Sequence, residues 1–516
     1  MENQPQTCQG KQTRKQLLEI KKRCRSIAGH FTRYILHTET LTEREGLRRE
    51  RFGEKENSKN KTILMVGETG TGKSTLINAF INHMLGVKYN EQIWCEIIET
   101  KKNQPNTQTT AVTVYDVFIE EFPFSLTVID TPGYGSKGGK EEDINTTKAL
   151  HDLIRDKDGV HKVDAVCLVV SSKITRLLEK QQYIFDAILS LFGSDVQRNI
   201  VLLITHATQK PTNALKAIKE SKLRCDETED GEPVYFRFDN SHCEGFTPEA
   251  EDEEYRGQDY KAAWENNERN MKDFFDFLSS CKPVSLKMTE KVLTTREQLT
   301  AAINNLKDRI TSTELKKQEL EQTKAAVEQH EKVMKDMTDF QYEVDEPYKE
   351  KVPIESKWWN MNKEATCCTV CEENCHYPGC WWVKDPYRCT IMSRGKCTVC
   401  SGKCDYTKHV KENKMYVSKT RKVKKTNEDL KKKYEEASGK TVSLRDQLEN
   451  EIRENEIEKS KLVDECYECM DKLEGIALKT DSVSTLQHID YLIEKLKETG
   501  NREKVQKLEE LKRRLT

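Results

Sequence analysis

The chain has 516 residues, of which 33% are charged and 35% hydrophobic, and its 85 basic and 87 acidic side chains nearly cancel. This length predicts three or four domains, and the balanced charge makes nucleic acid an unexpected partner. Because no run of about eighteen apolar residues occurs and the first residues lack the apolar core of a signal peptide, we expect no transmembrane segment and a cytoplasmic location with reduced cysteines.

The first 60 residues are polar, with scattered apolar positions. They predict a helix over 13–38 followed by a charged linker. From 61 to 283, short apolar runs alternate with helix-like stretches, a rhythm that favours an α/β domain of three layers around a mainly parallel sheet. The predicted strands are 62–66, 125–129, 165–170 and 200–204.

The first of these strands runs into a glycine-rich loop with the pattern G-x-x-x-x-G-K-S. Between a strand and a helix, this pattern is typical of a P-loop, whose backbone N–H groups surround a phosphate chain. Lys73 would reach the outer phosphates and Ser74 would bind Mg²⁺. The residues expected to bind nucleotide here are Gly67, Thr69, Gly70, Thr71, Gly72, Lys73, Ser74 and Thr75.

A second motif, D-T-P-G, follows the strand 125–129. The carboxylate of Asp130 is placed to bind Mg²⁺ through water, and the Gly133 amide to meet a γ-phosphate. Upstream, a Mg²⁺-binding threonine is expected at Thr110 or Thr109 rather than Thr113. We assign Lys73 and Thr110 to catalysis. Tyr134 stands where many GTPases carry a water-orienting glutamine, so we expect slow hydrolysis.

Base recognition is expected after the strand 200–204, where Thr205 and His206 stand and the guanine-reading pattern N-K-x-D is absent. With the P-loop, Q-T-T, D-T-P-G and I-T-H-A in this order, residues 61–280 resemble the septin-related, immunity-associated GTPases and the chloroplast import receptors of the same group. The resemblance implies that His206 stacks on guanine, that Asn240 completes the base pocket, and that nucleotide-loaded domains pair as homodimers or oligomers. This chain departs from the pattern at Asp239, where the family carries asparagine, and at Thr208, where a base-reading acid is common.

The remaining chain is charged and helix-like on both sides of a cysteine-rich segment. Apolar residues seven apart predict coiled-coil helices over 284–350 and 410–475. We expect them to form an antiparallel hairpin with the cysteine-rich segment at its tip, followed by C-terminal helices over 476–516 that break at Gly500.

The cysteine-rich segment, 366–409, predicts a zinc-binding knot, because two C-x-x-C pairs can each chelate one tetrahedral Zn²⁺. With Cys367 there are enough ligands for two closed sites with three left over, and the order of the residues leaves their pairing open. No zinc-finger spacing that would indicate nucleic-acid binding is present. The candidate ligands are Cys368, Cys371, Cys375, His376, Cys380, Cys389, Cys397, Cys400, Cys404 and His409.

Together these features predict a Mg²⁺-dependent GTP-binding switch with slow hydrolysis. Nucleotide would control self-association or the binding of a protein partner through the coiled coil or the zinc knot. Two alternatives remain open. One is a scaffold in which bound nucleotide is structural, and the other is an ATPase with the same P-loop.

Overall fold

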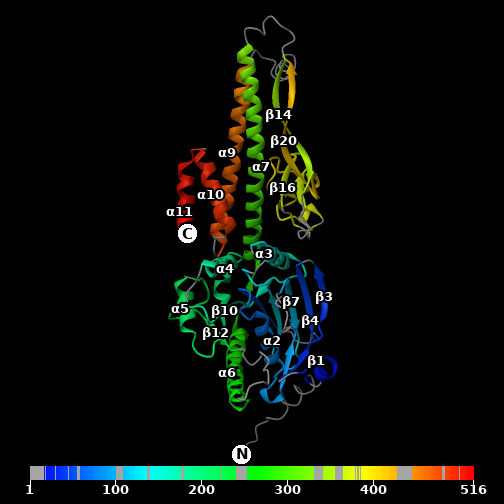
Figure 1. Cartoon of the computed structure of the whole chain (residues 1–516), viewed down its shortest axis with the longest axis vertical. Coiled ribbons are helices and arrows are strands. Elements are labelled where there is room, and N and C mark those ends of the chain that lie inside the picture. Colours follow the sequence, from blue (N-terminus) through cyan, green and yellow to red (C-terminus); the bar gives the residue numbers. More distant parts are fainter. Residues whose placement is uncertain are drawn as a thin grey trace, which may run out of the picture. The chain divides into compact units, whose positions relative to one another are not determined.

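The computed structural model describes two compact units, drawn in Figure 1. The first comprises Met1–Leu293 with Ile476–Lys479, and the second Thr294–Gly475 with Thr480–Thr516. The residues described are 17, 19–28, 31–44, 46–54, 59–99, 109–135, 140–175, 179–221, 223–239, 253–330, 341–354, 364–377, 379–380, 383, 385–426, 444–478, 483–498 and 500–515.

The first unit is built on an eight-stranded sheet. Its β7–β8 and β3–β4 pairs are antiparallel and its other neighbouring pairs are parallel, so the sheet is mixed but mainly parallel. All four strands predicted from the apolar runs are present, as β5, β8, β10 and β11. In spatial order the strands are β12 (Tyr235–Phe238), β11 (Ile200–Thr205), β10 (Ala165–Ser171), β5 (Asn60–Gly67), β8 (Ser125–Asp130), β7 (Val112–Val117), β4 (Leu47–Phe52) and β3 (Glu39–Arg44).

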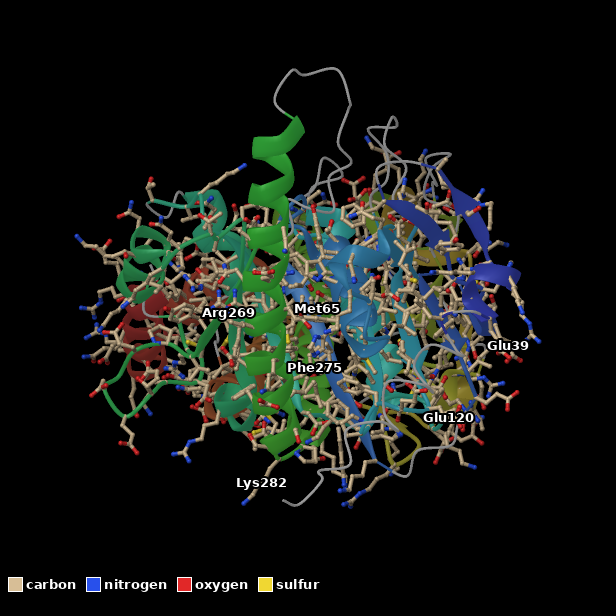
Figure 2. All side chains as sticks on the ribbon, turned by 90° about the horizontal axis from the view of Figure 1, so that it is seen from below. Glu39, Met65, Glu120, Arg269, Phe275 and Lys282 are labelled. Carbon is tan, nitrogen blue, oxygen red and sulfur yellow. The ribbon has the colours of Figure 1, made fainter. Side chains whose placement is uncertain are left out.

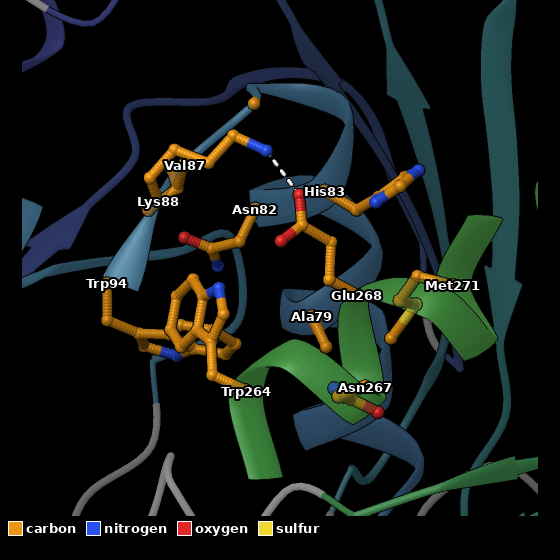
Figure 3. Close-up of a pocket in the computed structure, with 11 residues that line it drawn as sticks. Ala79, Asn82, His83, Val87, Lys88, Trp94, Trp264, Asn267, Glu268 and Met271 are labelled. Atoms are coloured by element: carbon orange, nitrogen blue, oxygen red, sulfur yellow. Dashed lines mark hydrogen bonds and ion pairs between the residues drawn. The ribbon is translucent and has the colours of Figure 1, made fainter. Parts of the chain in front are cut away.

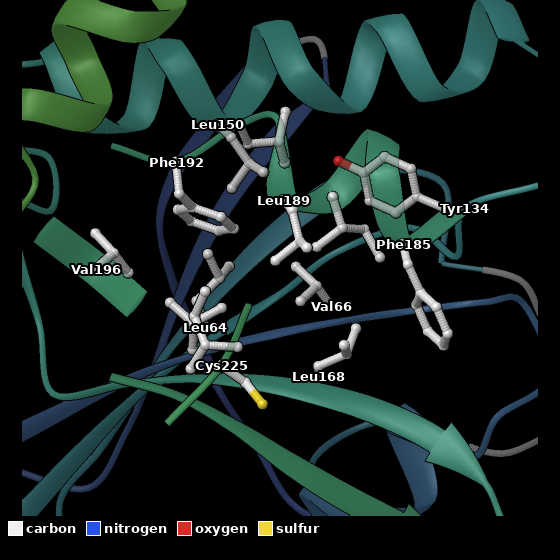
Figure 4. Packing of buried hydrophobic residues seen from close by; sticks show 14 of the residues in the cluster. Leu64, Val66, Tyr134, Leu150, Leu168, Phe185, Leu189, Phe192, Val196 and Cys225 are labelled. Carbon is white, nitrogen blue, oxygen red and sulfur yellow. The ribbon is translucent and has the colours of Figure 1, made fainter. Parts of the chain in front are cut away.

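Alternate residues of β5 point to opposite faces of this sheet, as strand geometry requires. Leu64 and Val66 belong to one buried cluster, drawn in Figure 4, and Met65 belongs to another that includes Phe275 of α6, labelled in Figure 2. A core on each face gives the three layers expected. The helices of this unit are α2 (Lys73–Met84), α3 (Lys140–Arg155), α4 (Glu179–Leu189), α5 (Thr212–Glu220) and α6 (Glu253–Ser280).

The segment before the P-loop differs from the prediction. Only the helical residues up to Arg23 fit the expected helix over 13–38, and strands follow from Arg25 onward. β3 and β4 form a hairpin that joins the main sheet through β4, which pairs with β7 and buries Leu47, Glu50 and Phe52. Smaller sheets contain β1 (Arg25–Ile27), β2 (Thr32–Ile35) and β6 (Ile93–Glu96), and β9 (Lys162–Val163) with β13 (Val284–Ser285).

The second unit contains most of α7 (Lys287–His330), then α9 (Leu444–Ile476), α10 (Val483–Glu498) and α11 (Arg502–Leu515). The helix expected from 284 and the two C-terminal helices are thus confirmed as helices. α7 and α9 run antiparallel, since Lys324 pairs with Glu449 at 2.8 Å and, earlier on α7, Arg309 pairs with Glu458. The predicted apolar seam of α7 is buried at Leu299, Ile303, Leu306 and Ile310.

Parts of both predicted coiled-coil helices are strands instead. β14 (Gln341–Pro353) and β20 (Lys414–Thr426) form an antiparallel ribbon, in which Val344 faces Val423. Pro347 lies inside the helix expected over 284–350, where it would remove a helical hydrogen bond and clash with the preceding turn. Tyr416 and Val423, which are seven residues apart, both lie on β20, where an odd spacing places their side chains on opposite faces. The helix prediction is therefore wrong over these two stretches.

Between these two strands lies the cysteine-rich region, with a sheet of β16 (Glu373–His376), β15 (Ala365–Cys368) and β19 (His409–Glu412), and a small hairpin of β17 (Met392–Ser393) and β18 (Lys396–Cys397). It packs on α7 through Asn305, which is 2% exposed and donates to Glu373 Oε2 at 3.1 Å. Trp358, Trp359, Trp381 and Trp382 are candidates from the sequence for a small apolar core around the metal ions, and all four lie outside the described residues.

In the part of the chain that the structure describes, the helices are all too polar or too short to cross a lipid bilayer.

Candidate functional site

The glycine-rich loop lies where the sequence predicts it, between β5 and α2. Gly72 caps α2 in the left-handed conformation, with φ of 87°, and its carbonyl accepts from the Leu76 N–H at 2.9 Å. A Cβ on Gly67 would lie 2.4 Å from the Val169 carbonyl oxygen, so that position also requires glycine. The loop therefore presents the start of a helix, where backbone N–H groups and the helix dipole favour an anion.

Lys73 is the cation of this loop. Its side chain is 7% exposed, and its Nζ donates to the Gly67 carbonyl at 3.0 Å and the Glu68 carbonyl at 3.1 Å. Burial lowers the pKa of Lys73 to about 8, although the nearby Asp130 acts in the opposite direction. A buried ammonium in this place favours a polyanionic ligand that would complete its neutralisation.

Asp130, at the end of β8, is the buried acid beside it. Its Oδ2 accepts from the Thr109 hydroxyl at 3.3 Å, while its Oδ1 is buried without a hydrogen-bond partner. Burial raises the pKa of Asp130 to about 6, against the effect of Lys73. An unsatisfied buried carboxylate oxygen next to a phosphate-binding loop has the chemistry of a Mg²⁺ ligand, either direct or through water.

The D-T-P-G loop contacts the P-loop directly. The Thr69 hydroxyl donates to the Gly133 carbonyl at 2.9 Å, and the Tyr134 N–H donates to the Gly67 carbonyl at 3.1 Å. A Cβ on Gly133 would come within 2.5 Å of the Thr69 Cα, which explains the glycine. The two predicted phosphate-contacting motifs are thus brought together.

The upstream threonines lie beside these loops. Thr109 is the one that reaches Asp130, whereas Thr110, the residue assigned to catalysis from the sequence, is exposed. Both line a cavity of about 120 Å³ that also touches Thr69 and Gly133. Ser74 and Thr75 lie on the first turn of α2, half-buried. That Thr110 and Ser74 bind Mg²⁺ stays a prediction.

Tyr134 is turned into the core. It is 1% exposed and belongs to the apolar cluster of Figure 4, with Phe185 and Leu189 of α4. The next residue, Gly135, donates its N–H to Asp143 Oδ1 at 3.2 Å, and Asp143 Oδ2 accepts from the Tyr183 hydroxyl. Asp143 was not among the residues predicted from the sequence, although an acid in the first turn of the helix after D-T-P-G could have indicated this anchoring role.

The predicted base-reading loop is fixed to the P-loop. The Thr205 hydroxyl donates to the Thr71 carbonyl at 2.7 Å. His206 is exposed and left-handed, with φ of 55°, and its carbonyl accepts from Ser172 Oγ at 2.5 Å. Asn240 lies outside the described residues, and its neighbour Asp239 is buried. An exposed imidazole held by its backbone is free to stack on a planar ligand.

A second pocket, of about 90 Å³, lies at the other end of α2, between that helix and α6. Figure 3 shows the Lys88–Glu268 ion pair over it and the two indole rings of Trp94 and Trp264, which meet edge to face. Burial lowers the pKa of His83 there to about 4, so the imidazole is neutral. The pocket contains none of the predicted site residues.

All predicted zinc ligands fall into three compact groups. Within each group the ligand atoms lie within 4.8 Å of one another, and Cys400 belongs to two groups. Cys367 stands apart: burial raises the pKa of its thiol to about 11, and its Sγ contacts Asn374 Oδ1 at 3.4 Å. The groups are Cys368, Cys371, Cys400 and Cys404; Cys375, Cys397, Cys400 and His409; and His376, Cys380 and Cys389.

Residues 61–223 match the model of the AIG1 family. Among curated proteins, the chain is 30% identical over 155 residues to the translocase of chloroplast 34 homolog of Chlamydomonas reinhardtii, and 33% identical over 112 residues to septin-1 of Drosophila melanogaster. The matches cover 30% and 20% of this chain, and the chain spans only 36% and 29% of the length of those relatives.

Among solved structures, the chain is similar to Toc33 from Arabidopsis thaliana in complex with Mg²⁺ and GMPPNP, with 19% identity and a TM-score of 0.30. That likeness covers 43% of this chain and 87% of that chain. A dimerisation-deficient mutant of Toc33 gives 18% identity and a TM-score of 0.30, and the likeness covers 44% of this chain and 88% of that chain.

Proposed function

From the premise that residues 61–223 form an AIG1-family G domain, we propose that the chain is a Mg²⁺-dependent GTP-binding switch. The observation that carries the proposal is the pairing of a buried cation with a buried acid between two loops. Lys73 and Asp130 are both buried, and Asp130 Oδ1 has no hydrogen-bond partner. A nucleotide with its Mg²⁺ would neutralise both groups, which gives the site a strong preference for the loaded state.

GTP is the proposed nucleotide, on two grounds. The AIG1 match and the similarity to a septin and to a chloroplast translocase favour a GTPase ancestry. In addition, His206 is exposed directly after a strand that Thr205 ties to the P-loop, and an imidazole there can stack on guanine.

Hydrolysis by a single chain is proposed to be slow. Tyr134 occupies the position of the water-orienting glutamine, and its ring is buried in the core rather than directed at the cavity. A missing group can be supplied by a second copy of the chain. We therefore propose that the loaded G domain associates with itself, and that nucleotide state controls this association.

The second unit is proposed to bind zinc and a protein partner. The three cysteine and histidine groups support metal binding, since tetrahedral sets of thiolate and imidazole ligands favour zinc. In this proposal zinc is structural and stabilises a small region of short strands.

The deciding experiment uses the whole chain with Mg²⁺ and measures competition of GTP and ATP against a fluorescent GTP analogue. We expect GTP to compete at least about a hundredfold better, or about 2.7 kcal/mol. Equal affinities would favour the P-loop ATPase alternative. Hydrolysis and sedimentation in GTP and GDP complete the test: tight binding without turnover or change of size would favour the scaffold alternative.

A further inference from the structure

We propose that the cysteine-rich region holds three zinc ions and that the Cys400 thiolate bridges two of them. The inference rests on the zinc binding proposed above and assigns ligands to each ion. It is independent of the nucleotide chemistry of the first unit.

The ligands come from an internal repeat. The sequence Cys-Thr-Val-Cys occurs at 368–371 and at 397–400, and each copy is followed four residues later by another cysteine, Cys375 or Cys404. In the structure these trailing cysteines are exchanged. Cys404 joins the first Cys-Thr-Val-Cys, and Cys375 joins the second. If each repeat bound its own ion, its trailing cysteine would stay with it. Two ions held between the repeats instead each take the trailing cysteine of the other repeat.

The sulfur spacings fit metal sites and not disulfides. Cys371 Sγ and Cys404 Sγ lie 3.6 Å apart, and Cys380 Sγ and Cys389 Sγ lie 3.8 Å apart. A disulfide needs about 2.05 Å. Two thiolates bound at about 2.3 Å on one tetrahedral zinc are separated by about 3.8 Å.

Backbone N–H groups point at the same sulfur atoms. The Cys371 N–H lies 3.4 Å from Cys368 Sγ, and the N–H groups of Val399 and Cys400 lie 3.3 and 3.4 Å from Cys397 Sγ. The Cys404 N–H lies 3.3 Å from Cys400 Sγ. These donors stabilise anionic sulfur, which is the form that binds zinc.

His409 supplies the clearest single indication of a bound metal ion. Its Nδ1 lies 3.0 Å from the Asp405 carbonyl oxygen, which can only accept, so Nδ1 carries the proton. In the neutral ring, Nε2 then holds the lone pair. Nε2 is buried without a hydrogen-bond partner and lies within 4.8 Å of the sulfur atoms of Cys375, Cys397 and Cys400. A carbonyl that fixes the tautomer is the usual outer support of a zinc-bound histidine.

Cys400 is the ligand that both four-membered groups require. Without it, each group would be left with three described ligands. Six thiolates around two divalent ions leave a net negative charge, and two ammonium groups lie beside the repeats. Lys349 Nζ donates to the Glu372 carbonyl at 2.8 Å. Lys403 Nζ donates to the Thr398 carbonyl at 2.8 Å and also pairs with Glu465 at 2.7 Å.

The third ion is assigned to the remaining group. His376 Nδ1 lies 3.2 Å from Cys389 Sγ and 3.6 Å from Cys380 Sγ, close to the nitrogen–sulfur separation on a tetrahedral zinc. All three side chains are buried. The part of the chain that the structure describes supplies three ligands to this site.

Native mass spectrometry and elemental analysis of the purified whole chain test the stoichiometry, and cadmium NMR of the cadmium-substituted chain tests the bridge. We expect three zinc ions per chain and two cadmium resonances coupled to each other through a shared thiolate. The matched variants are Cys368→Ser and its neighbour Cys367→Ser. The first is expected to lose at least one ion, and the second to keep all three.

Cys380→Ser gives a separate readout, since we expect it to lose one ion and to leave the coupled pair of cadmium resonances in place. Three uncoupled resonances would overturn the bridge, and two zinc ions per chain would overturn the count of three. Either result would leave zinc binding itself intact. A chain that carries iron, or no metal, would overturn both zinc proposals without bearing on GTP binding.

Discussion

Asp130 is the residue where the electrostatics of the nucleotide site can be tested most directly. Because burial raises its pKa to about 6, the carboxylate is ionised at neutral pH and becomes protonated as the pH falls through that value. We expect Mg²⁺-dependent GTP affinity to decrease below about pH 6, by about tenfold per pH unit. Titration of a fluorescent GTP analogue across this range, with Mg²⁺ and with chelator, measures it. An affinity that does not change with pH would contradict the assignment.

The raised pKa of Asp130 makes the stability of the nucleotide-free chain change with pH in the opposite direction to its GTP affinity. An acid whose pKa rises on folding costs stability above about pH 6, and the cost disappears as the pH falls toward the ordinary value of 3.8. Asp130→Asn is therefore expected to raise the free energy of unfolding at neutral pH by about 1–2 kcal/mol while it weakens nucleotide binding. Denaturant unfolding of both proteins without nucleotide tests this. A destabilised variant would show that the ionised Asp130 does not cost the folded chain stability.

His206 is the residue on which base selectivity is expected to depend. Removal of a stacking imidazole should weaken GTP by about tenfold, or about 1.4 kcal/mol, and should change ATP affinity less. The GTP-to-ATP ratio of His206→Ala, measured by competition, checks this. Lys210→Ala, an exposed change in the same loop, is the control. An unchanged ratio in His206→Ala would place base recognition elsewhere.

Residues of the phosphate loops were predictable because their chemistry is local. The spacing of Gly67, Gly72 and Lys73 already requires a loop between strand and helix. The choice between Thr109 and Thr110 could not be predicted from the sequence, since it depends on which hydroxyl the fold turns toward Asp130. Asp143 was missed for the same reason: its partner Gly135 is set by the docking of α3.

At the scale of elements, apolar strands were easier to predict than charged ones. The strands β5, β8, β10 and β11 are mostly apolar and buried on both faces. β3, β4, β14 and β20 carry many charges. In β14 and β20, the alternation typical of a strand is harder to recognise than the seven-residue spacing of apolar residues. Pro347 was the local signal against a helix. The exchange of trailing cysteines between the two repeats depends on tertiary packing, so it could not be predicted from the order of the residues.

The ribbon of β14 and β20 is held to α7 by a buried acid. Glu319 is 4% exposed, and its carboxylate accepts from Lys425 at 2.6 Å and from Lys316 at 2.8 Å. Although burial raises the pKa of Glu319, the two lysines lower it below the ordinary value on balance. The carboxylate therefore stabilises the fold above the ordinary pKa of 4.5, and this contribution is lost as the pH falls through the lowered pKa.

We expect Glu319→Gln to cost about 1–2 kcal/mol in the free energy of unfolding at neutral pH, because it leaves two ammonium groups without their shared partner. Glu321→Gln, an exposed change on the same helix, should cost little. Denaturant unfolding followed by circular dichroism compares them. Equal stabilities of the two variants would show that the ribbon does not depend on this pair.

At the scale of the whole molecule, each unit has its own buried core and its own proposed ligand. We expect GTP with Mg²⁺ to raise the melting temperature of the first unit, with about 2.7 kcal/mol gained when free nucleotide is a hundredfold above its Kd. A zinc chelator should lower the melting of the second unit. Differential scanning calorimetry with each addition measures both, and Cys400→Ser should reduce the response to chelator without changing the response to GTP, since the group of His376, Cys380 and Cys389 does not include Cys400. A chelator effect as large in this variant as in the unchanged chain would contradict the metal assignment.

The hairpin of β3 and β4 has a consequence for how the chain can be divided. The family match begins at residue 61, yet β4 is the parallel neighbour of β7, whose Val112 and Val114 are fully buried. A fragment that starts at 61 would expose β7 as an open edge, with unpaired N–H and C=O groups beside apolar side chains. Such edges recruit strands from other molecules. Fragments for biochemistry should therefore begin before Glu39, or aggregation will be mistaken for nucleotide-driven assembly.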